Sequence, residues 1–313
     1  MFECRNLVKR FGETVALDGT SFSIPEGRLT VLIGPSGCGK STTLRILNRL
    51  IEPDGGEVLY RGRPLSSYDP VELRRSMGYV IQHIGLFPHW TVERNICTVP
   101  RLLGWPPERQ RARALELLEL VGLPPDEYAR KMPHQLSGGE AQRVGVARAL
   151  AADPPVILMD EPFGAADPLT RSRLQEEFLA IQRRLRKTVV FVTHDMGEAI
   201  RLGDRIILMR EGRVVREAAT EDLVRSGDGF VKTFLGSESV LLLLECHTME
   251  EIARPAPPTI PEELPRVPGA ATVRDGLSLL LESGAPMLAV EEQGGILGIA
   301  GLKEIQALVR RGR

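Results

Sequence analysis

The most informative stretch of this chain is the run Gly-Pro-Ser-Gly-Cys-Gly-Lys-Ser at 34–41. It fits the pattern G-x-x-x-x-G-K-[ST] and follows an apolar run at 29–33 that predicts a buried strand. Glycines in such a loop let backbone N–H groups form a concave anion site, and a helix from about Lys40 adds its positive dipole end. Lys40 would reach the β- and γ-phosphates, and the Ser41 hydroxyl would hold Mg²⁺. The run predicts a nucleoside triphosphate site formed by Gly34, Pro35, Ser36, Gly37, Cys38, Gly39, Lys40, Ser41 and Thr42.

Two acidic residues follow a second apolar run at 156–159. Asp160 would stand at the tip of this expected strand, where its carboxylate is suited to hold Mg²⁺ directly or through water. Glu161 is suited to orient or deprotonate the attacking water. Carboxylates beside a triphosphate repel it unless a cation intervenes, so the pair also implies Mg²⁺. Alone, this pattern is a common strand-to-loop transition, and the phosphate loop upstream favours the functional interpretation.

A third candidate is the run Leu-Ser-Gly-Gly-Glu at 136–140, before a helix expected over 141–152. Ser137 and Glu140 have the S-x-x-E spacing of a capping box, so the run could be only a well-capped helix start. Gly138 and Gly139 indicate more, because glycine is unfavourable in the first turn of a helix and permits the close approach of an anion.

The elements that must position these groups alternate between strand and helix. Continuous apolar runs predict strands buried on both faces of a parallel sheet, at 29–33, 156–159 and 189–193. Shorter strands are expected at 57–60 and 78–82. This alternation predicts an α/β core.

Two helices are expected beside the candidate site. The first follows the phosphate loop, with apolar positions at Leu44, Ile46, Leu47 and Leu50. The second runs over about 168–186, with Asp167 as its cap and a proline as its first residue.

The bulk composition excludes several classes of protein. At 313 residues the chain can form one large core or two domains. Apolar residues make up 42% and charged residues 26%, as in a soluble globular protein, and a net charge of −1 indicates no general attraction to nucleic acid or anionic lipid. We expect no membrane span and no signal peptide. Four widely spaced cysteines favour a reducing compartment over a zinc site or disulfide framework: Cys4, Cys38, Cys97 and Cys246.

Composition changes after about residue 236. Six prolines between 255 and 268 predict an extended connector. Beyond it we expect a small α+β domain, with a helix, two strands and a final helix at 272–283, 287–291, 296–300 and 303–310. The expected domains are 1–236, and 237–313 as a linker with the small domain.

Taken together, these motifs resemble those of the ATP-binding subunits of ABC transporters. The run at 136–140 is similar to the family's signature, usually written LSGGQ, with Glu140 where glutamine is usual. Asp160 and Glu161 resemble its Walker B acids. Residues 163–167 resemble its D-loop, with alanine at 166 where leucine is usual.

Two single residues extend the resemblance. Gln82 matches the glutamine of the family's Q-loop, and His194 matches its switch histidine. The motifs occur in the family's order over about residues 1–236. The resemblance implies an ABC-type P-loop NTPase core with antiparallel β and helical subdomains, followed by a small C-terminal α+β domain.

The resemblance also implies how these residues act. Two copies would enclose two ATP molecules head to tail, each phosphate loop facing the other copy's signature residues Ser137, Gly138, Gly139 and Glu140. Gln82 would contact the metal ion, which Ser41 and Asp160 also hold, and its loop would touch the membrane partner. His194 would contact the γ-phosphate and Glu161. The implied catalytic residues are Lys40, Gln82, Glu161 and His194.

Phe11 has two interpretations. The resemblance implies that it stacks on adenine, whereas an aromatic residue near a strand end is as often part of the core.

The subgroup is indicated by residues 78–89, which closely resemble ATP-binding subunits that serve glycine betaine, choline and carnitine import. Residues 272–277, 287–290 and 298–305 are similar to a CBS motif, which subgroup members often carry in pairs. One such motif is evident here. It could sense ionic strength or bind an adenine-containing regulator, or it could serve dimerisation or stability alone.

The resemblance implies an ATPase that uses ATP and Mg²⁺ to energise an importer of quaternary-amine osmoprotectants. Its partners would be a second copy of itself, integral membrane permease subunits and, indirectly, a solute-binding protein. It would lie peripherally on the cytoplasmic face of the membrane. An importer of another small solute, such as an amino acid, is the alternative.

Two other classes are disfavoured. ABC ATPases that act on DNA or ribosomes usually have coiled-coil insertions or two linked cores, and this sequence shows neither, nor a basic face, so nucleic acid is not expected as a partner. A regulator that binds nucleotide without turnover is opposed by the intact set of Lys40, Asp160, Glu161 and His194.

Overall fold

The chain forms two compact units. The computed structural model describes residues 1–82, 85–164, 168–224, 231, 234, 239–256, 264–292 and 295–311. Contacts divide the chain into Met1–Glu217 and Ala218–Arg313, and each unit has its own hydrophobic core. None of the helices within the described residues is long and apolar enough to cross a lipid bilayer.

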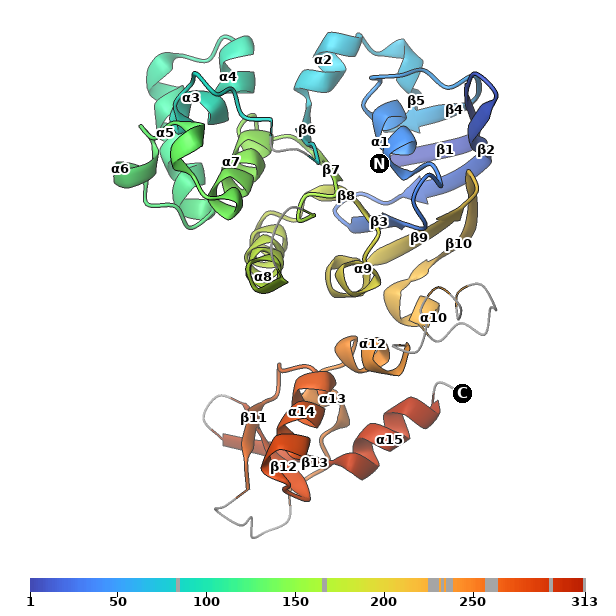
Figure 1. The fold of residues 1–313 in the computed structure, drawn as a ribbon, viewed down its shortest axis with the longest axis vertical. Helices are drawn as coiled ribbons and strands as arrows, with labels where there is room; N and C mark the ends of the chain where they lie inside the picture. Colours follow the sequence, from blue (N-terminus) through green and yellow to red (C-terminus); the bar gives the residue numbers. More distant parts are fainter. Residues whose placement is uncertain are drawn as a thin grey trace. The chain divides into compact units, whose positions relative to one another are not determined.

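A parallel array of buried strands lies at the centre of the first unit (Figure 1). In the described part of the chain this sheet has the order β10-β9-β3-β8-β7-β6. Its strands are β3 (Leu29–Ile33), β6 (Met77–Val80), β7 (Val156–Asp160), β8 (Thr188–Thr193), β9 (Arg205–Arg210) and β10 (Arg213–Ala219). Pairing is parallel from β9 through β6, and every residue of β3, β7 and β8 is buried, which confirms the predicted α/β core.

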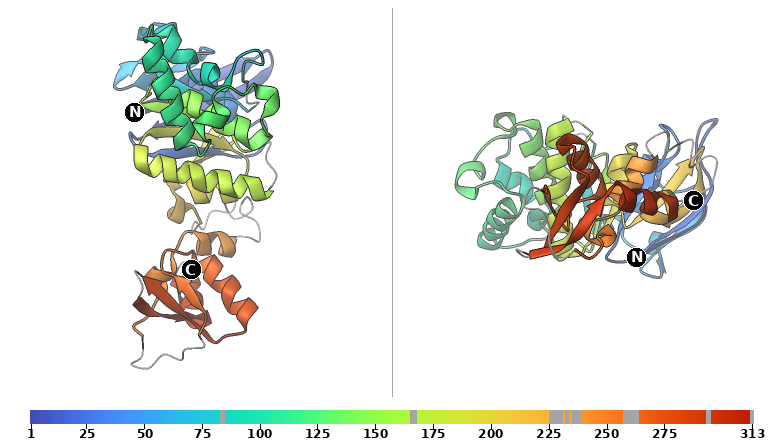
Figure 2. Two further views of the ribbon diagram at one scale, coloured as in Figure 1. Left: turned by 90° about the vertical axis from the view of Figure 1, so that its left-hand side faces the viewer. Right: turned by 90° about the horizontal axis from the view of Figure 1, so that it is seen from below.

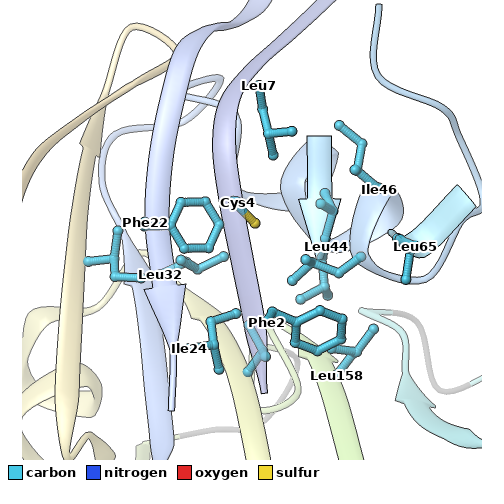
Figure 3. Close-up of a cluster of buried hydrophobic side chains, with 14 of the residues drawn as sticks. Phe2, Cys4, Leu7, Phe22, Ile24, Leu32, Leu44, Ile46, Leu65 and Leu158 are labelled. Atoms are coloured by element: carbon cyan, nitrogen blue, oxygen red, sulfur yellow. The ribbon is translucent and has the colours of Figure 1, made fainter. Parts of the chain in front are cut away.

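A second, antiparallel sheet is formed by β1 (Phe2–Phe11), β2 (Thr14–Ile24), β4 (Gly55–Tyr60) and β5 (Arg63–Pro64). Figure 3 shows side chains from β1 and β2 meeting side chains of helix α1 (Lys40–Leu47) and of β7. Phe2, Ile24, Leu44 and Leu158 are four of these buried residues. The helix that follows the phosphate loop is therefore anchored in the main core, which gives the loop a rigid support.

A group of helices gathers at the β6 edge of the parallel sheet (Figure 1). Helices α3 (Val92–Ile96), α5 (Pro107–Leu120) and α7 (Gly138–Leu150) contact one another, and α7 packs on β6. Helix α8 (Pro168–Leu185) packs beside α7 and α9 (Met196–Leu202) (Figure 2). The other helical elements described in this unit besides α1 are η1 (Leu65–Ser67), α2 (Pro70–Arg75), α4 (Thr98–Leu102), α6 (Pro125–Tyr128) and η2 (Pro133–Gln135).

Helix α1 is shorter than its apolar pattern predicted. It ends at Leu47, and Leu50, expected on its apolar face, is 48% exposed. Arg49 takes a left-handed conformation with φ 48°. The N–H of Arg49 donates to the Ile46 carbonyl and the N–H of Leu50 donates to the Arg45 carbonyl, at 2.9 and 2.8 Å. This hydrogen-bonded end satisfies the last carbonyls and stops the helix.

Two other boundaries differ from expectation. Strand β6 ends at Val80, so Gln82 lies beyond the strand rather than within it. Helix α7 begins at Gly138 instead of residue 141, because Ser137 caps it from outside. The cap expected at Asp167 for α8 lies outside the described residues.

The second unit contains β11 (Arg266–Pro268), β12 (Met287–Glu292) and β13 (Gly295–Gly301), in the order β11-β12-β13. Strand β11 runs parallel to β12, and β13 is antiparallel to it. The helices are α10 (Thr220–Val224), α12 (Ser239–Glu245), α13 (Met249–Ile252), α14 (Val273–Ser283) and α15 (Leu302–Arg311). Their core includes Leu244, Met249, Leu280 and Leu288.

Both described ends of the proline-rich segment pair with the second unit. Before it, Arg254 forms an antiparallel bridge with Ile299, and at its end Arg266 pairs with Ala289. Val267 is buried in the core of the second unit. The described ends of the segment are thus held by backbone pairing inside that unit, and residues 257–263 lie outside the described part of the chain.

The boundary expected at residue 236 falls between α10 and α12. These two helices contact each other, so contacts divide the chain earlier, after Glu217. Residues 235–238 lie outside the described part of the chain.

Candidate nucleotide and magnesium site

The phosphate loop joins the end of β3 to the start of α1. Gly34, Gly37 and Gly39 have positive φ values of 155°, 79° and 104°. A Cβ atom on Gly34 would lie 2.1 Å from the Met209 carbonyl oxygen, and one on Gly39 would lie 2.6 Å from the Ala16 carbonyl oxygen. The first and last glycines are therefore required by close backbone contacts, and the loop they form opens directly into a helix N-terminus.

The lysine of this loop is turned back over it. Lys40 is buried, and its Nζ donates to the carbonyl oxygens of Gly34 at 2.8 Å and Pro35 at 3.0 Å. A triphosphate would offer this ammonium charged acceptors at the same place, which are stronger partners than neutral carbonyls. Burial raises the pKa of the neighbouring Cys38 thiol above its usual value. Pro35, Ser36 and Gly37 are exposed at the loop's surface, and Ser41 and Thr42 are half-buried behind them.

A hydroxyl and a carboxylate meet behind the loop. Ser41 Oγ donates to Asp160 Oδ1 at 2.9 Å, which joins the first turn of α1 to the tip of β7. Asp160 is buried, and this burial, together with the charge of Glu161, raises its pKa. A buried carboxylate without a cation is unfavourable, and hydroxyl and carboxylate oxygens are the ligands that Mg²⁺ prefers. The two residues therefore fit a magnesium ion that phosphate oxygens would complete.

Glu161 is placed by a strained backbone. It has φ 45°, an uncommon value for a residue with a side chain, and its N–H donates to the Val192 carbonyl at 3.0 Å. This bond ties the end of β7 to β8. The side chain is 21% exposed, so it stands at the edge of the site, accessible to water.

The glutamate gathers two other predicted residues around its carboxylate. Gln82 Nε2 donates to Glu161 Oε2 at 3.1 Å, and His194 Nδ1 lies 3.3 Å from Glu161 Oε1. These three residues come from segments that follow β6, β7 and β8, which are neighbours in the sheet. The carboxyl ends of parallel strands meet at one edge, and the residues after them form one cluster.

The signature run starts a well-capped helix, as its spacing predicted. Ser137 Oγ accepts from the Glu140 N–H at 3.3 Å, and Glu140 Oε2 accepts from the Ser137 N–H at 2.6 Å. Tyr128 adds a bond from its hydroxyl to Glu140 Oε1 at 2.5 Å. These donors lower the pKa of Glu140 to about 2, and the Tyr128 hydroxyl has the largest effect. Glu140 is thus a carboxylate fully engaged with its own helix start.

Signature and phosphate loop are not joined within one chain. Among the described residues, no hydrogen bond or ion pair links 137–140 to 34–42. A Cβ on Gly138 would meet no atom within 4 Å, so the start of α7 presents open backbone. An anion could approach this helix start closely.

Phe11 is at the end of β1 and is 49% exposed, which excludes the core interpretation. Lys9 Nζ lies 5.6 Å from the centre of its ring. The D-loop residues 165–167 and residues 83–84 of the subgroup stretch lie outside the described part of the chain.

Sequence reasoning missed two groups beside the site. No sequence pattern indicates a role for Tyr128, because its contact with Glu140 depends on the packing of α6 against the start of α7. Glu198 is buried in the first turn of α9, and the Asp195-x-x-Glu198 spacing is a helix-start pattern that could have drawn attention to it.

Comparison with known proteins supports the reading of these motifs. The ABC transporter family pattern matches residues 17–164. The choline transport ATP-binding protein OpuBA of Bacillus subtilis is 51% identical over 243 residues, 77% of this chain and 64% of that protein. The chain therefore spans slightly less than two thirds of OpuBA. The glycine betaine uptake system ATP-binding protein YehX of Escherichia coli is 46% identical over 297 residues, 94% of this chain and 95% of that protein.

Solved structures agree with the fold. A bacterial ABC transporter cassette, solved as a dimer, is 38% identical, with a TM-score of 0.63 over 70% of this chain and 99% of the cassette. The same cassette has been solved in a post-hydrolysis state bound to ADP and Pi. The match to YehX along nearly the whole of both chains, with the motifs in their places, shows that this chain belongs to the ATP-binding proteins of the ABC transporter family.

Proposed function

We propose that this chain is the ATP-hydrolysing subunit of an importer for quaternary-amine osmoprotectants, the class to which glycine betaine, carnitine and choline belong. The observation that carries the catalytic part is the cluster of Gln82, Glu161 and His194 beside the Ser41–Asp160 pair. Its proximity to that pair supports Glu161 as the base, Gln82 and His194 as its orienting partners, and Ser41 and Asp160 as magnesium ligands.

The triphosphate is held by the loop residues 34–42. Lys40 exchanges its bonds to the loop carbonyls for bonds to the β- and γ-phosphates, and backbone N–H groups at the start of α1 complete the cradle. Ser41 and Asp160, with Gln82 at the rim, hold Mg²⁺, which neutralises charge on the phosphates. Phe11 offers an exposed ring for adenine.

Hydrolysis depends on Glu161. Its carboxylate accepts a hydrogen bond from the attacking water and orients or deprotonates it. Gln82 and His194 hold the carboxylate from two sides, at 3.1 and 3.3 Å. His194 is 61% exposed and can reach toward the γ-phosphate. These roles of Glu161, Gln82 and His194 are the ones that the family resemblance implies.

A second copy completes the site. The signature residues Ser137, Gly138, Gly139 and Glu140 begin α7 with open backbone, and within one chain they have no described bond to the phosphate loop. Facing another copy's nucleotide, this helix start directs its N–H groups and dipole at the γ-phosphate. The dimeric structure of the related cassette supports this arrangement.

The substrate class is supported by the names of the relatives. OpuBA is a choline transport protein and YehX belongs to a glycine betaine uptake system. The ATPase itself does not select the solute, which is recognised by the permease and by a solute-binding protein. An amino-acid importer is the competing assignment.

A groove beside the Q-loop is suited to a permease segment. It has a volume of about 290 Å³ and is lined by apolar side chains and by Arg74, Arg75 and Arg148. Ile81 and Phe87 are exposed in it. A permease helix with an apolar face would fit this groove, and such a contact would hold the chain at the cytoplasmic face of the membrane.

We assign the second unit a single CBS-like motif. The order β11-α14-β12-β13-α15 supports it, as strand-helix-strand-strand-helix around one core. The motif either senses ionic strength or an adenine-containing regulator, or serves dimerisation or stability alone.

Proteoliposomes that contain this subunit with its permease and solute-binding protein test the function. We expect ATP-dependent uptake of radiolabelled glycine betaine, and none with Lys40→Ala in place of the wild type. Uptake of amino acids instead would reject the substrate class. Betaine uptake that is the same without the subunit would reject the proposal.

A further inference from the structure

A carboxyl group lies buried next to the switch histidine without a role in the chemistry above. Glu198, in the first turn of α9, is 7% exposed. Its Oε2 accepts from Thr193 Oγ1 at 2.5 Å, and its Oε1 accepts from Gln175 Nε2 at 2.9 Å. Both oxygens are thus used, although burial raises the pKa of this group. A buried carboxyl that is fully hydrogen-bonded specifies the geometry around it.

The hydrogen bonds of Glu198 enclose the turn that carries His194. Thr193 precedes the histidine, and its Oγ1 also accepts from the Asp195 N–H at 3.0 Å. Asp195 follows the histidine, and its Oδ1 accepts from the Glu198 N–H at 3.0 Å. The residues on both sides of His194 are therefore bonded to Glu198. The exposed His194 ring has little packing of its own, so its direction depends on this turn.

The same network attaches the turn to helix α8. Gln175 belongs to α8, and its Oε1 accepts from Arg201 at 3.5 Å. Arg171, also in α8, lies 3.8 Å from the Asp195 carboxylate. The charged groups that act on Glu198 are Asp195 and Arg171, and Arg201 contacts its hydrogen-bond partner Gln175.

We propose that Glu198 is a positioning residue for His194. Through Thr193 and Gln175 it holds the switch-histidine turn against α8 and keeps the His194 ring aimed at Glu161. This inference rests on the proposed ATPase function and deepens it, because it names the group that maintains the catalytic arrangement from behind.

The test replaces one hydroxyl at each end of the same strand. Thr193→Val removes the bonds from Thr193 to Glu198 and Asp195 with little change of shape. Thr188→Val is the matched control, because Thr188 is also buried in β8 and its Oγ1 accepts one bond, from the Gly27 N–H at 2.9 Å. In the permease-reconstituted complex we expect Thr193→Val to lower kcat about 10-fold or more, with KM for ATP within about 2-fold.

Two comparisons exclude a general loss of structure. The control should lose thermal stability, by about 2–4 °C, and keep kcat. Thr193→Ser, which retains the hydroxyl, should restore kcat to near the wild-type value. Glu198→Gln should lower kcat as Thr193→Val does, and the double variant should be no slower than either single variant.

The outcomes separate this inference from the function on which it rests. A wild-type kcat in Thr193→Val, or an equal loss in Thr188→Val, overturns the positioning role while leaving the ATPase assignment intact. A complex whose wild-type form hydrolyses no ATP overturns the ATPase assignment itself, and this inference with it.

Discussion

At the scale of single residues, Asp160 combines an unfavourable position with a functional one. Its carboxylate is buried beside Glu161, and burial raises its pKa. The group ionises more readily in the unfolded chain than in the folded one, so its charge lowers stability at neutral pH. This loss disappears as the pH falls below the ordinary aspartate pKa of about 4.

Replacement of this carboxylate should therefore stabilise the protein and impair the reaction. Asp160→Asn can still accept the Ser41 hydrogen bond but carries no charge. We expect its melting temperature at pH 7 to rise by roughly 2–4 °C without nucleotide, and the gain to vanish near pH 4. ATPase activity should fall about 100-fold with the loss of a magnesium ligand. An unchanged activity would show that Asp160 does not hold the metal.

The pKa of Glu140 is shifted in the opposite direction, so its charge stabilises the fold. The Tyr128 hydroxyl and the Ser137 N–H lower its pKa to about 2, below the ordinary glutamate value. Its stabilising effect is thus complete above the unfolded pKa and is lost as the pH falls toward 2.

The change Glu140→Gln tests this directly. We expect it to lower the free energy of unfolding in urea at pH 6, and to lower it less at pH 3. The reason is that the stabilisation by the charged Glu140 carboxylate decreases as the pH falls from 6 to 3. Tyr128→Phe removes one of the hydrogen-bond donors to Glu140. In a Tyr128→Phe background, the stability difference caused by Glu140→Gln should therefore depend less on pH. A difference that is constant with pH would contradict the assigned cause.

At the scale of elements, the phosphate loop depends on a close approach to two neighbouring strands. A Cβ at position 39 would lie 2.6 Å from the Ala16 carbonyl oxygen in β2, whereas one at position 37 would meet no atom within 4 Å. Both positions have positive φ, so both substitutions carry conformational strain.

These two glycines form a matched pair for measurement. Gly37→Ala should cost about 1–2 kcal/mol, the penalty of left-handed alanine. Gly39→Ala adds a backbone clash and should cost more than about 3 kcal/mol, with ATP affinity lost in calorimetry. Equal unfolding midpoints for the two variants would show that the contact with β2 is not what selects glycine.

At the scale of the whole molecule, the active form is expected to be a dimer that closes on ATP. Glu161→Gln keeps the phosphate loop and the magnesium ligands but removes the base. It should bind ATP and hydrolyse it at least about 100-fold more slowly than the wild type. It should also remain a closed dimer in size-exclusion chromatography with Mg-ATP. Lys40→Ala should lose nucleotide affinity and stay monomeric. A Glu161→Gln rate near wild type would contradict the role of the glutamate.

The sequence alone predicted the features that depend on neighbours along the chain. The buried strands β3, β7 and β8 follow from their continuous apolar runs, and the cap of α7 follows from the spacing of Ser137 and Glu140. The phosphate loop follows from its glycines and from the strand and helix beside them. The apolar pattern also predicted too long a helix α1, because the pattern continues to Leu50 although the left-handed Arg49 stops the helix.

The tertiary structure decided which distant residues meet. Gln82, Glu161 and His194 share one cluster only because β6, β7 and β8 are adjacent in a parallel sheet, and no local pattern specifies that order. The bond from Tyr128 to Glu140 and the network of Glu198 are likewise products of helix packing. Periodicity and capping act over one or two turns of chain, whereas these contacts arise when the buried faces of separate elements pack together.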